Sequence, residues 1–299
     1  MTIRIDQLEQ IVRRYLATGT AVVVVVLAPG TGTPAATDAG PASATTTVTV
    51  APDPPAPPAG TSTGPPHDTK RNTEQNTRPS TARGPVDGTT AAATLGWGEP
   101  VRADEFDAGT RQWSIYDGPG HAGEGRRSPS AVSVRDGVLT ITGDPSGTTA
   151  GMSWGDGRRY GRWEARVRAP AGDPSYNALV LLWPDADNFP EGGEIDFMEI
   201  GDPDRQEVDV FLHYGEDDEQ KHGRVETDAT RWHNWAVEWT PTSITTFLDG
   251  RKWYGTTDHA VQPPGPMHLC IQLDWFPSGS GTVQESTMQV DWVREYDLG

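Results

Sequence analysis

The sequence predicts an all-β protein whose folded part is a two-sheet β-sandwich of the jelly-roll type, preceded by a disordered N-terminal leader and linker. Three observations carry this prediction. Short stretches of alternating apolar and polar residues follow one another with turn signals at regular spacing. No stretch keeps a capped amphipathic helical period over three turns. Every aromatic residue except Tyr15 lies at or beyond Trp97, so the core is expected there.

Residues 1–36 have the pattern of an export signal. Arg13 and Arg14 precede an apolar run at 15–28, and small residues follow it. The run is shorter than the ~20 apolar residues that cross a bilayer comfortably. Two interpretations stay open: a cleaved signal that leaves a secreted, extracellular protein, and an uncleaved signal anchor that tethers it to a membrane. We expect membrane contact only through this segment.

Residues 37–93 are expected to form a disordered linker. Residues 29–93 hold 12 of the 26 prolines and are rich in Thr, Ala, Gly and Ser. Such a composition cannot bury enough apolar surface to offset the entropy of ordering, and it favours polyproline II conformations. The folded domain is therefore expected over residues 94–299, which is long enough for a sizeable core.

The negative charge also lies in the folded part. The chain has 24 Lys and Arg against 42 Asp and Glu, a net charge of −18, whereas residues 1–93 hold seven of each kind. A domain this acidic repels phosphate backbones, so nucleic acid is not expected as a partner. A neutral polymer suits it better, and we expect the protein to be a monomer.

The expected strands follow the chain from the linker to the C-terminus. Hairpin turns are predicted at Asp136-Gly137 and Asp249-Gly250. Cys270 lies in an apolar strand and is interpreted as a buried structural thiol; a single cysteine excludes an intrachain disulfide. The strand segments are 131–142, 161–169, 177–183, 207–214, 233–240, 243–254, 267–275 and 286–296.

The segment GEIDFMEI, residues 193–200, holds three carboxylates in a mostly apolar strand. Alternation places Glu194 and Asp196 on one face and Glu199 on the other. A β-bulge at Phe197 or Met198 would return Glu199 to the face of the other two, and bulges are frequent beside active sites. The opposing interpretation is a solvated outer face, which most charge runs form. The glycines that flank this segment and the Trp-rich surroundings favour a functional site.

Two glutamates brought together in this way have the chemistry of a retaining glycosidase. Such enzymes hold two carboxyl groups ~5–5.5 Å apart. Like charges at that separation resist joint ionisation, so one carboxyl stays ionised as a nucleophile and the other stays protonated as an acid. Asp196, between the two glutamates, is expected to hydrogen-bond one of them and set which holds the proton.

The sequence resembles glycoside hydrolase family 16. The resemblance rests on GGEIDFME and extends to YGRWEARVRAP, LLWPDADNFP, RWHNWAVEWTPTSITTFLDGRKWY and MQVDWVREYD, which follow one another in family order. It implies a concanavalin A-like jelly roll and retaining cleavage within a β-linked polysaccharide, with no cofactor for catalysis. It also implies that Glu194 is the nucleophile, Asp196 the assisting acid and Glu199 the general acid/base.

The resemblance further implies a substrate class. The extra residue between Asp196 and Glu199 is typical of laminarinases, agarases and carrageenases, and the acidic protein lacks a basic surface for sulfated galactans. A neutral β-1,3-glucan is the expected substrate, although residues 199–223 depart from familiar laminarinases. Two alternatives stay open: a transglycosylase that uses the same site, and a non-catalytic or wall-associated sugar-binding module.

Further residues are implied by the family or by general features of sugar sites. The family often has a histidine near the acids, here His213, and many members hold a structural Ca²⁺, for which Asp291 and the Gly137 carbonyl lie at matching motifs. Sugars bind by stacking on aromatic rings and by hydrogen bonds to polar groups. We therefore expect sugar contacts from Trp183, Trp154, Trp275, Asn177 and Arg158, and core positions for Trp163, Trp235, Trp239 and Trp292.

Overall fold

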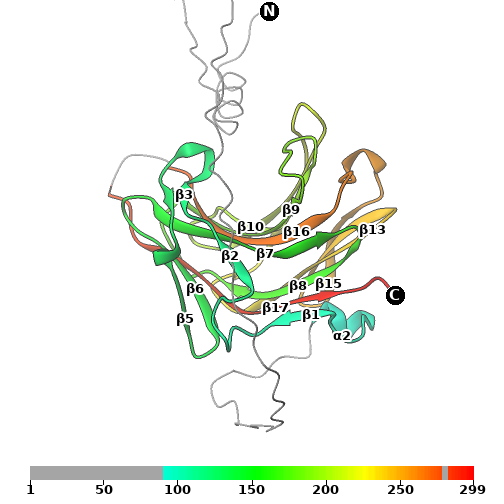
Figure 1. Ribbon diagram of the computed structural model, residues 1–299, viewed down its shortest axis with the longest axis horizontal. Coiled ribbons are helices and arrows are strands. Elements are labelled where there is room, and N and C mark those ends of the chain that lie inside the picture. Colours follow the sequence, from blue (N-terminus) through cyan, green and yellow to red (C-terminus); the bar gives the residue numbers. More distant parts are fainter. Residues whose placement is uncertain (1–89, 278–281) are drawn as a thin grey trace, which may run out of the picture. The chain divides into compact units, whose positions relative to one another are not determined.

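The computed structural model describes residues 90–277 and 282–299, which form two β-sheets packed face to face (Figure 1). The predicted sandwich is therefore confirmed. The predicted export segment and nearly all of the predicted linker lie outside the described residues. Within the described part of the chain, no helix is long and apolar enough to cross a lipid bilayer.

One sheet, which we call the back sheet, is antiparallel throughout. Seven of its strands form a continuous path, and a short N-terminal strand, β1 (Arg102–Asp104), pairs with β17. In spatial order the path is β15 (Arg251–Thr256), β14 (Ser243–Leu248), β13 (His233–Thr240), β8 (Gly161–Arg168), β17 (Ser286–Tyr296), β6 (Val138–Gly143) and β5 (Val132–Arg135).

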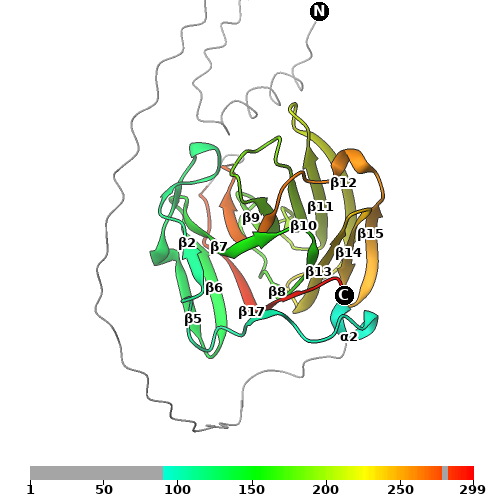
Figure 2. The same ribbon diagram turned by 45° about the vertical axis from the view of Figure 1, so that its right-hand side comes forward.

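The other sheet, which we call the site sheet, curves so that the face turned away from the back sheet is concave (Figure 1). Its strands are antiparallel except for the β4–β7 pair, and β2 (Trp113–Ile115) pairs with β7. In spatial order it contains β12 (Glu219–Glu226), β11 (Glu207–Tyr214), β10 (Glu194–Ile200), β9 (Tyr176–Pro184), β16 (Met267–Trp275), β7 (Thr148–Arg158), β4 (Arg126–Arg127) and β3 (Gly118–Pro119). Figure 2 shows β10, β11 and β12 side by side.

The core fills the space between the sheets with the inward residues of alternating strands. The four tryptophans predicted as core are all at most 1% exposed, so that prediction is confirmed. Both predicted hairpin turns are present, because β5 and β6 pair across Asp136-Gly137 and β14 and β15 pair across Asp249-Gly250. All four turn residues have positive φ, which matches the twist of a tight two-residue hairpin. Cys270 is a buried free thiol, as expected.

Within residues 90–277 and 282–299 the helical segments are short. Three are single 3₁₀ turns between strands, η1 (His121–Gly123), η2 (Pro129–Ala131) and η3 (His259–Val261). One is a five-residue helix, α2 (Ala91–Leu95), which precedes β1.

Helix α2 corrects the predicted boundary at residue 94. Thr90 caps its N-terminus by accepting a hydrogen bond from the Ala93 N–H at 3.1 Å. Its first two N–H groups, those of Ala91 and Ala92, donate to the buried carboxylate of Glu164 on β8. The folded unit therefore includes residues 90–93. In the sequence these alanines cannot be told from those of the linker. Their place in the folded unit follows only from their contacts with strand β8.

Candidate active site

Strand β10 contains the predicted bulge. Against β9, Asp196 and Met198 pair with consecutive residues, so Phe197 is the extra one. Against β11, Asp196 and Glu199 are three residues apart while their partners are only two apart. Phe197 and Met198 are both fully buried in the main core. The bulge resets the alternation, and Glu199 faces the same side of the sheet as Asp196.

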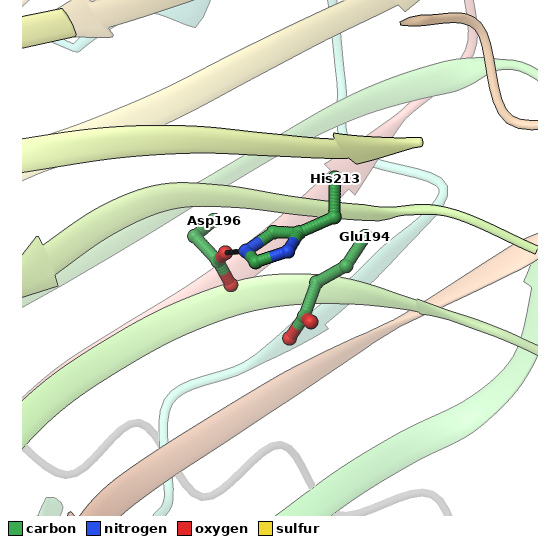
Figure 3. Close-up of side chains that lie close together, drawn as sticks. All are labelled: Glu194, Asp196 and His213. Atoms are coloured by element: carbon green, nitrogen blue, oxygen red, sulfur yellow. Dashed lines mark ion pairs between the residues drawn. The ribbon is translucent and has the colours of Figure 1, made fainter. Parts of the chain in front are cut away.

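The outward face of β10 brings Glu194 and Asp196 to His213, which lies on the neighbouring strand β11 (Figure 3). Glu194 is directly opposite His213 in the strand register. The Nε2 atom of His213 is 3.3 Å from Oδ2 of Asp196. The predicted association of His213 with the acids is therefore present in the fold.

His213 carries a positive charge in this site. Its other ring nitrogen, Nδ1, is 2.7 Å from a carboxylate oxygen of Asp218. Burial by itself lowers the pKa of His213, but hydrogen bonds to Asp196 and Asp218 and the charge of Glu194 outweigh it and raise the pKa to about 11. Ligand atoms of Glu194, Asp196 and His213 lie within 4.8 Å of one another, as in a metal site. Without a metal, the same residues form an ion-paired network in which His213 contacts Asp196 through Nε2 and Asp218 through Nδ1.

Glu199 is held by an amide. The Nδ2 atom of Asn177, on β9, donates to Oε1 of Glu199 at 2.8 Å. Burial and the charge of Asp196 raise the pKa of Glu199 to about 7, against the lowering effect of the Asn177 hydrogen bond and of the His213 charge. Glu199 can therefore hold a proton up to neutral pH and release it there, which is what a general acid/base requires.

Glu194 has a different electrostatic environment. Burial and the neighbouring carboxyl of Asp196 raise its pKa well above the ordinary value, and the positive charge of His213 acts in the opposite direction. The site thus combines two carboxyl groups with raised pKa values, Glu194 and Glu199, with an imidazolium that acts on both.

An aromatic and apolar patch lies beside His213, whose ring centroid is 5.6 Å from that of Phe189. Trp183, the predicted sugar platform, is on β9 and packs on an apolar cluster that includes Leu181 and Cys270. Its indole N–H donates to Asp187 at 2.9 Å. The ring of Phe189 stacks on it, with centroids 5.3 Å apart and an interplanar angle of 15°. Sequence reasoning missed Phe189, although its place just before the acidic motif was a usable signal.

A family model for glycosyl hydrolases family 16 matches residues 124–294, more than half of the chain and all three acids of β10. The chain belongs to glycosyl hydrolase family 16. The resemblance seen in the sequence is thus confirmed.

Relatives of this family 16 chain agree with that membership. A β-glucanase of Rhodothermus marinus is 33% identical over 164 residues, which cover 46% of this chain and 57% of the relative. An endo-1,3-1,4-β-glycanase of Rhizobium meliloti is 28% identical over 193 residues, which cover 57% of this chain and 40% of the relative. The catalytic domain of an endo-1,3-β-glucanase from Thermotoga petrophila superposes with a TM-score of 0.59 at 20% identity, covering 67% of this chain and 98% of that domain. This last likeness shows the shared fold. The matches to the two curated relatives span about half of their lengths or less.

Two of the tryptophans predicted to line the family 16 site lie in the core instead. Trp154 is on β7, fully buried, and stacks on Trp113 with centroids 5.5 Å apart. Trp275 is the last residue of β16, is 8% exposed and packs on Tyr176 with centroids 5.0 Å apart. Both residues belong to strands whose alternation turns them toward the core.

Arg158 also points away from the acids. Its guanidinium lies 3.2 Å from Glu295 on β17 and 2.5 Å from Asp297, so it links the end of β7 to the back sheet. Asn177 does reach the site, as described above, but its amide is used by Glu199 rather than left free for a sugar.

The calcium ligands implied by the family do not fit this chain well. The Asp291 carboxylate lies 3.4 Å from Nε of Arg166, which already supplies a positive charge. Gly137 is in the β5–β6 turn with φ of +74°. Because Arg166 already neutralises the charge of Asp291, a cation would gain little there. Catalysis in this family requires no cofactor.

A second polar cluster lies on the site sheet, on the far side of β9 from the acids, and sequence reasoning did not find it. Arg127 of β4 donates to both carboxylate oxygens of Asp274 at 2.7 and 2.9 Å. The hydroxyl of Tyr116 lies 3.3 Å from the thiol of Cys270, and burial raises the pKa of that thiol to about 12. These contacts join strands β4 and β16 and a loop, so no local sequence pattern predicts them.

Proposed function

We propose that this family 16 chain is a retaining, endo-acting glycoside hydrolase that cleaves a neutral β-linked glucan. The observation that carries the proposal is the bulge in β10, which brings Glu199 to the face of Glu194 and Asp196. A sugar-binding module without turnover has no need for acids of graded pKa on one face.

The proposed reaction has two steps. In the first step the Glu194 carboxylate attacks the anomeric carbon while Glu199 gives its proton to the departing glycosidic oxygen. The product is an ester between Glu194 and the sugar. Glu199, now ionised, takes a proton from water as that water attacks the same carbon and releases Glu194. Two inversions at one carbon retain its configuration.

The first step needs an ionised Glu194. Burial and the Asp196 carboxyl raise the pKa of Glu194, and the positive charge of His213 acts against them and so favours the ionised form. The Oδ1 atom of Asp196 is buried without a hydrogen-bond partner among the described residues.

A β-1,3-glucan is the proposed substrate. The relatives' names cite β-1,3 and mixed β-1,3-1,4 linkages. The extra residue in β10 favours the laminarinase branch, and the net charge of −18 disfavours sulfated polymers.

The test is a reducing-end assay of the full chain on laminarin, lichenan, agarose and xyloglucan. Release from laminarin above the rest is expected, and proton NMR should detect the β-anomer first. The Glu194→Gln variant should lose turnover by at least ~10³-fold while still binding the glucan, because the amide cannot form the ester.

The alternatives predict other results. Binding without reducing-end release from any of the polymers would favour the non-catalytic module. Longer products from an oligosaccharide acceptor would favour transglycosylation. An α-anomer formed first would exclude the two-step mechanism.

We also propose that residues 1–36 direct export and that the protein acts outside the cell as a monomer. The support is the basic and apolar pattern of that segment alone. N-terminal sequencing of protein recovered from the culture medium tests both export and cleavage, and light scattering tests the monomer.

A further inference from the structure

The hairpin between β11 and β12 places a fourth carboxylate behind the active-site histidine. Asp218 ends this turn in a left-handed conformation, with φ of +52°. Its Oδ1 atom lies 2.7 Å from Nδ1 of His213, on the side of the ring opposite Asp196. The side chains of His213 and Asp218 are only 16% and 20% exposed, so solvent screens this contact weakly.

We propose that Asp218 is a positioning residue for the reaction: its carboxylate holds the His213 ring so that the Nε2 N–H donates to Asp196. Only the expected effect of Asp218 on turnover rests on the proposed function. The clamp itself is a property of the folded chain.

The geometry requires two protons on the ring. A carboxylate oxygen is an acceptor, and His213 has one on each side, at 2.7 Å from Nδ1 and 3.3 Å from Nε2. A neutral imidazole has a single N–H and can satisfy only one of them. Two flanking carboxylates therefore select the imidazolium and fix its plane, because both hydrogen bonds must lie near that plane.

The charged groups that raise the pKa of His213 come from two elements. Glu194 and Asp196 are on β10 and Asp218 is in the hairpin, and all of them favour the charged ring. His213 in turn lowers the pKa of Glu199 and of His121 in η1. Without Asp218, burial would still lower the pKa of His213, while one of the two hydrogen bonds that raise this pKa would be lost. The ring would then lose its positive charge, which acts on Glu194 and Asp196, at a lower pH.

The chain offers a matched control and a rescue. Asp217 is the adjacent residue of the same hairpin and is exposed, so Asp217→Asn removes the same charge without touching the ring. Gln220 lies opposite His213 in the β11–β12 register, with Nε2 3.3 Å from Nδ1. Gln220→Glu therefore returns a carboxylate to Nδ1 from another strand. Asn tolerates the left-handed conformation as Asp does, so Asp218→Asn keeps the turn.

The test follows the His213 ring by ¹⁵N NMR from pH 6 to 12 and measures kcat and KM on laminarin. In the Asp218→Asn protein the pKa of His213 should fall by at least about one unit, a tenfold change in its proton affinity. The value of kcat should fall about tenfold with little change in KM. Asp217→Asn should match the wild type, and Asp218→Asn/Gln220→Glu should regain most of the lost proton affinity.

An unchanged His213 titration in Asp218→Asn would overturn the inference, as would an equal shift in Asp217→Asn. The NMR titration needs no substrate. If no polysaccharide is cleaved, the proposed function fails while the clamp is still judged on its own result.

Discussion

At the scale of single residues, Asn177 sets when Glu199 gives up its proton. Its amide donates to the ionised form of Glu199 and so lowers a pKa that burial and Asp196 raise to about 7. In Asn177→Ala the ionised form loses this donor, and the pKa of Glu199 should rise. The alkaline limb of the pH dependence of kcat/KM, where the acid is lost, should therefore move to higher pH. A limb that stays in place or moves to lower pH would show that Asn177 does not act on Glu199 in this way.

Sequence reasoning at this scale found the acids and misplaced several of their neighbours. Glu194, Asp196 and Glu199 share one short strand, so a local pattern with one bulge was sufficient to place them on one face. Asp218 reaches the site only because β11 and β12 pair in one register. Trp154 shows the converse, because nothing within its own segment shows that its strand turns it toward the core.

At the scale of elements, α2 and β8 share one buried ionisable group. Glu164 is fully buried beneath the helix, and burial raises its pKa from 4.5 to about 7, against the lowering effect of the Ala91 and Ala92 N–H groups. A carboxyl whose folded-state pKa is raised binds its proton more tightly in the folded chain. Its contribution to stability is therefore fully present below about pH 4.5 and is lost as the pH rises toward 7.

Substitution of Glu164 should reveal this dependence. Glu164→Gln keeps an oxygen acceptor and should remove the part of the stability loss between pH 4.5 and 7 that this group causes. Glu164→Ala leaves two buried N–H groups without that acceptor and should cost about 1–3 kcal/mol at any pH. Urea unfolding at pH 5 and pH 7.5 measures both effects. Parallel pH dependence in the wild type and in Glu164→Gln would refute the assignment.

The strands were largely predictable because their apolar residues alternate and their turns carry Asp-Gly signals. The helix was not, because five residues with three alanines have no amphipathic period. Its stability comes from Glu164 and from an apolar cluster with the nearby Trp97 and with Phe247 and Tyr296, which are distant in sequence. Tertiary contacts, rather than propensity, decide such short elements.

At the scale of the whole molecule, the excess of acids sets which polymers approach. All of the net charge of −18 arises beyond residue 93, in the family 16 domain. A field of this sign repels sulfated chains and has little effect on neutral ones. The rate on laminarin should therefore change by less than about twofold between 10 and 500 mM NaCl, because salt screens charges and a neutral glucan carries none.

A sulfated galactan should resist cleavage throughout that range. Its faster cleavage at 10 mM than at 500 mM NaCl would mean that attraction, not repulsion, governs its approach, and the neutral substrate class would be wrong.

The bulge in β10 also affects which single-residue deletions this strand can tolerate in evolution. Loss of one codon normally inverts every later side chain of a strand. Loss of Met198 would instead remove the bulge and leave Glu194, Asp196 and Glu199 at alternate positions of a regular strand, so that all three still point outward. A single deletion can therefore shorten this strand while its three acids stay on the same face. A chain lacking Met198 should still melt cooperatively, whereas one lacking Leu181 in the unbulged β9 should not, and calorimetry would separate the two.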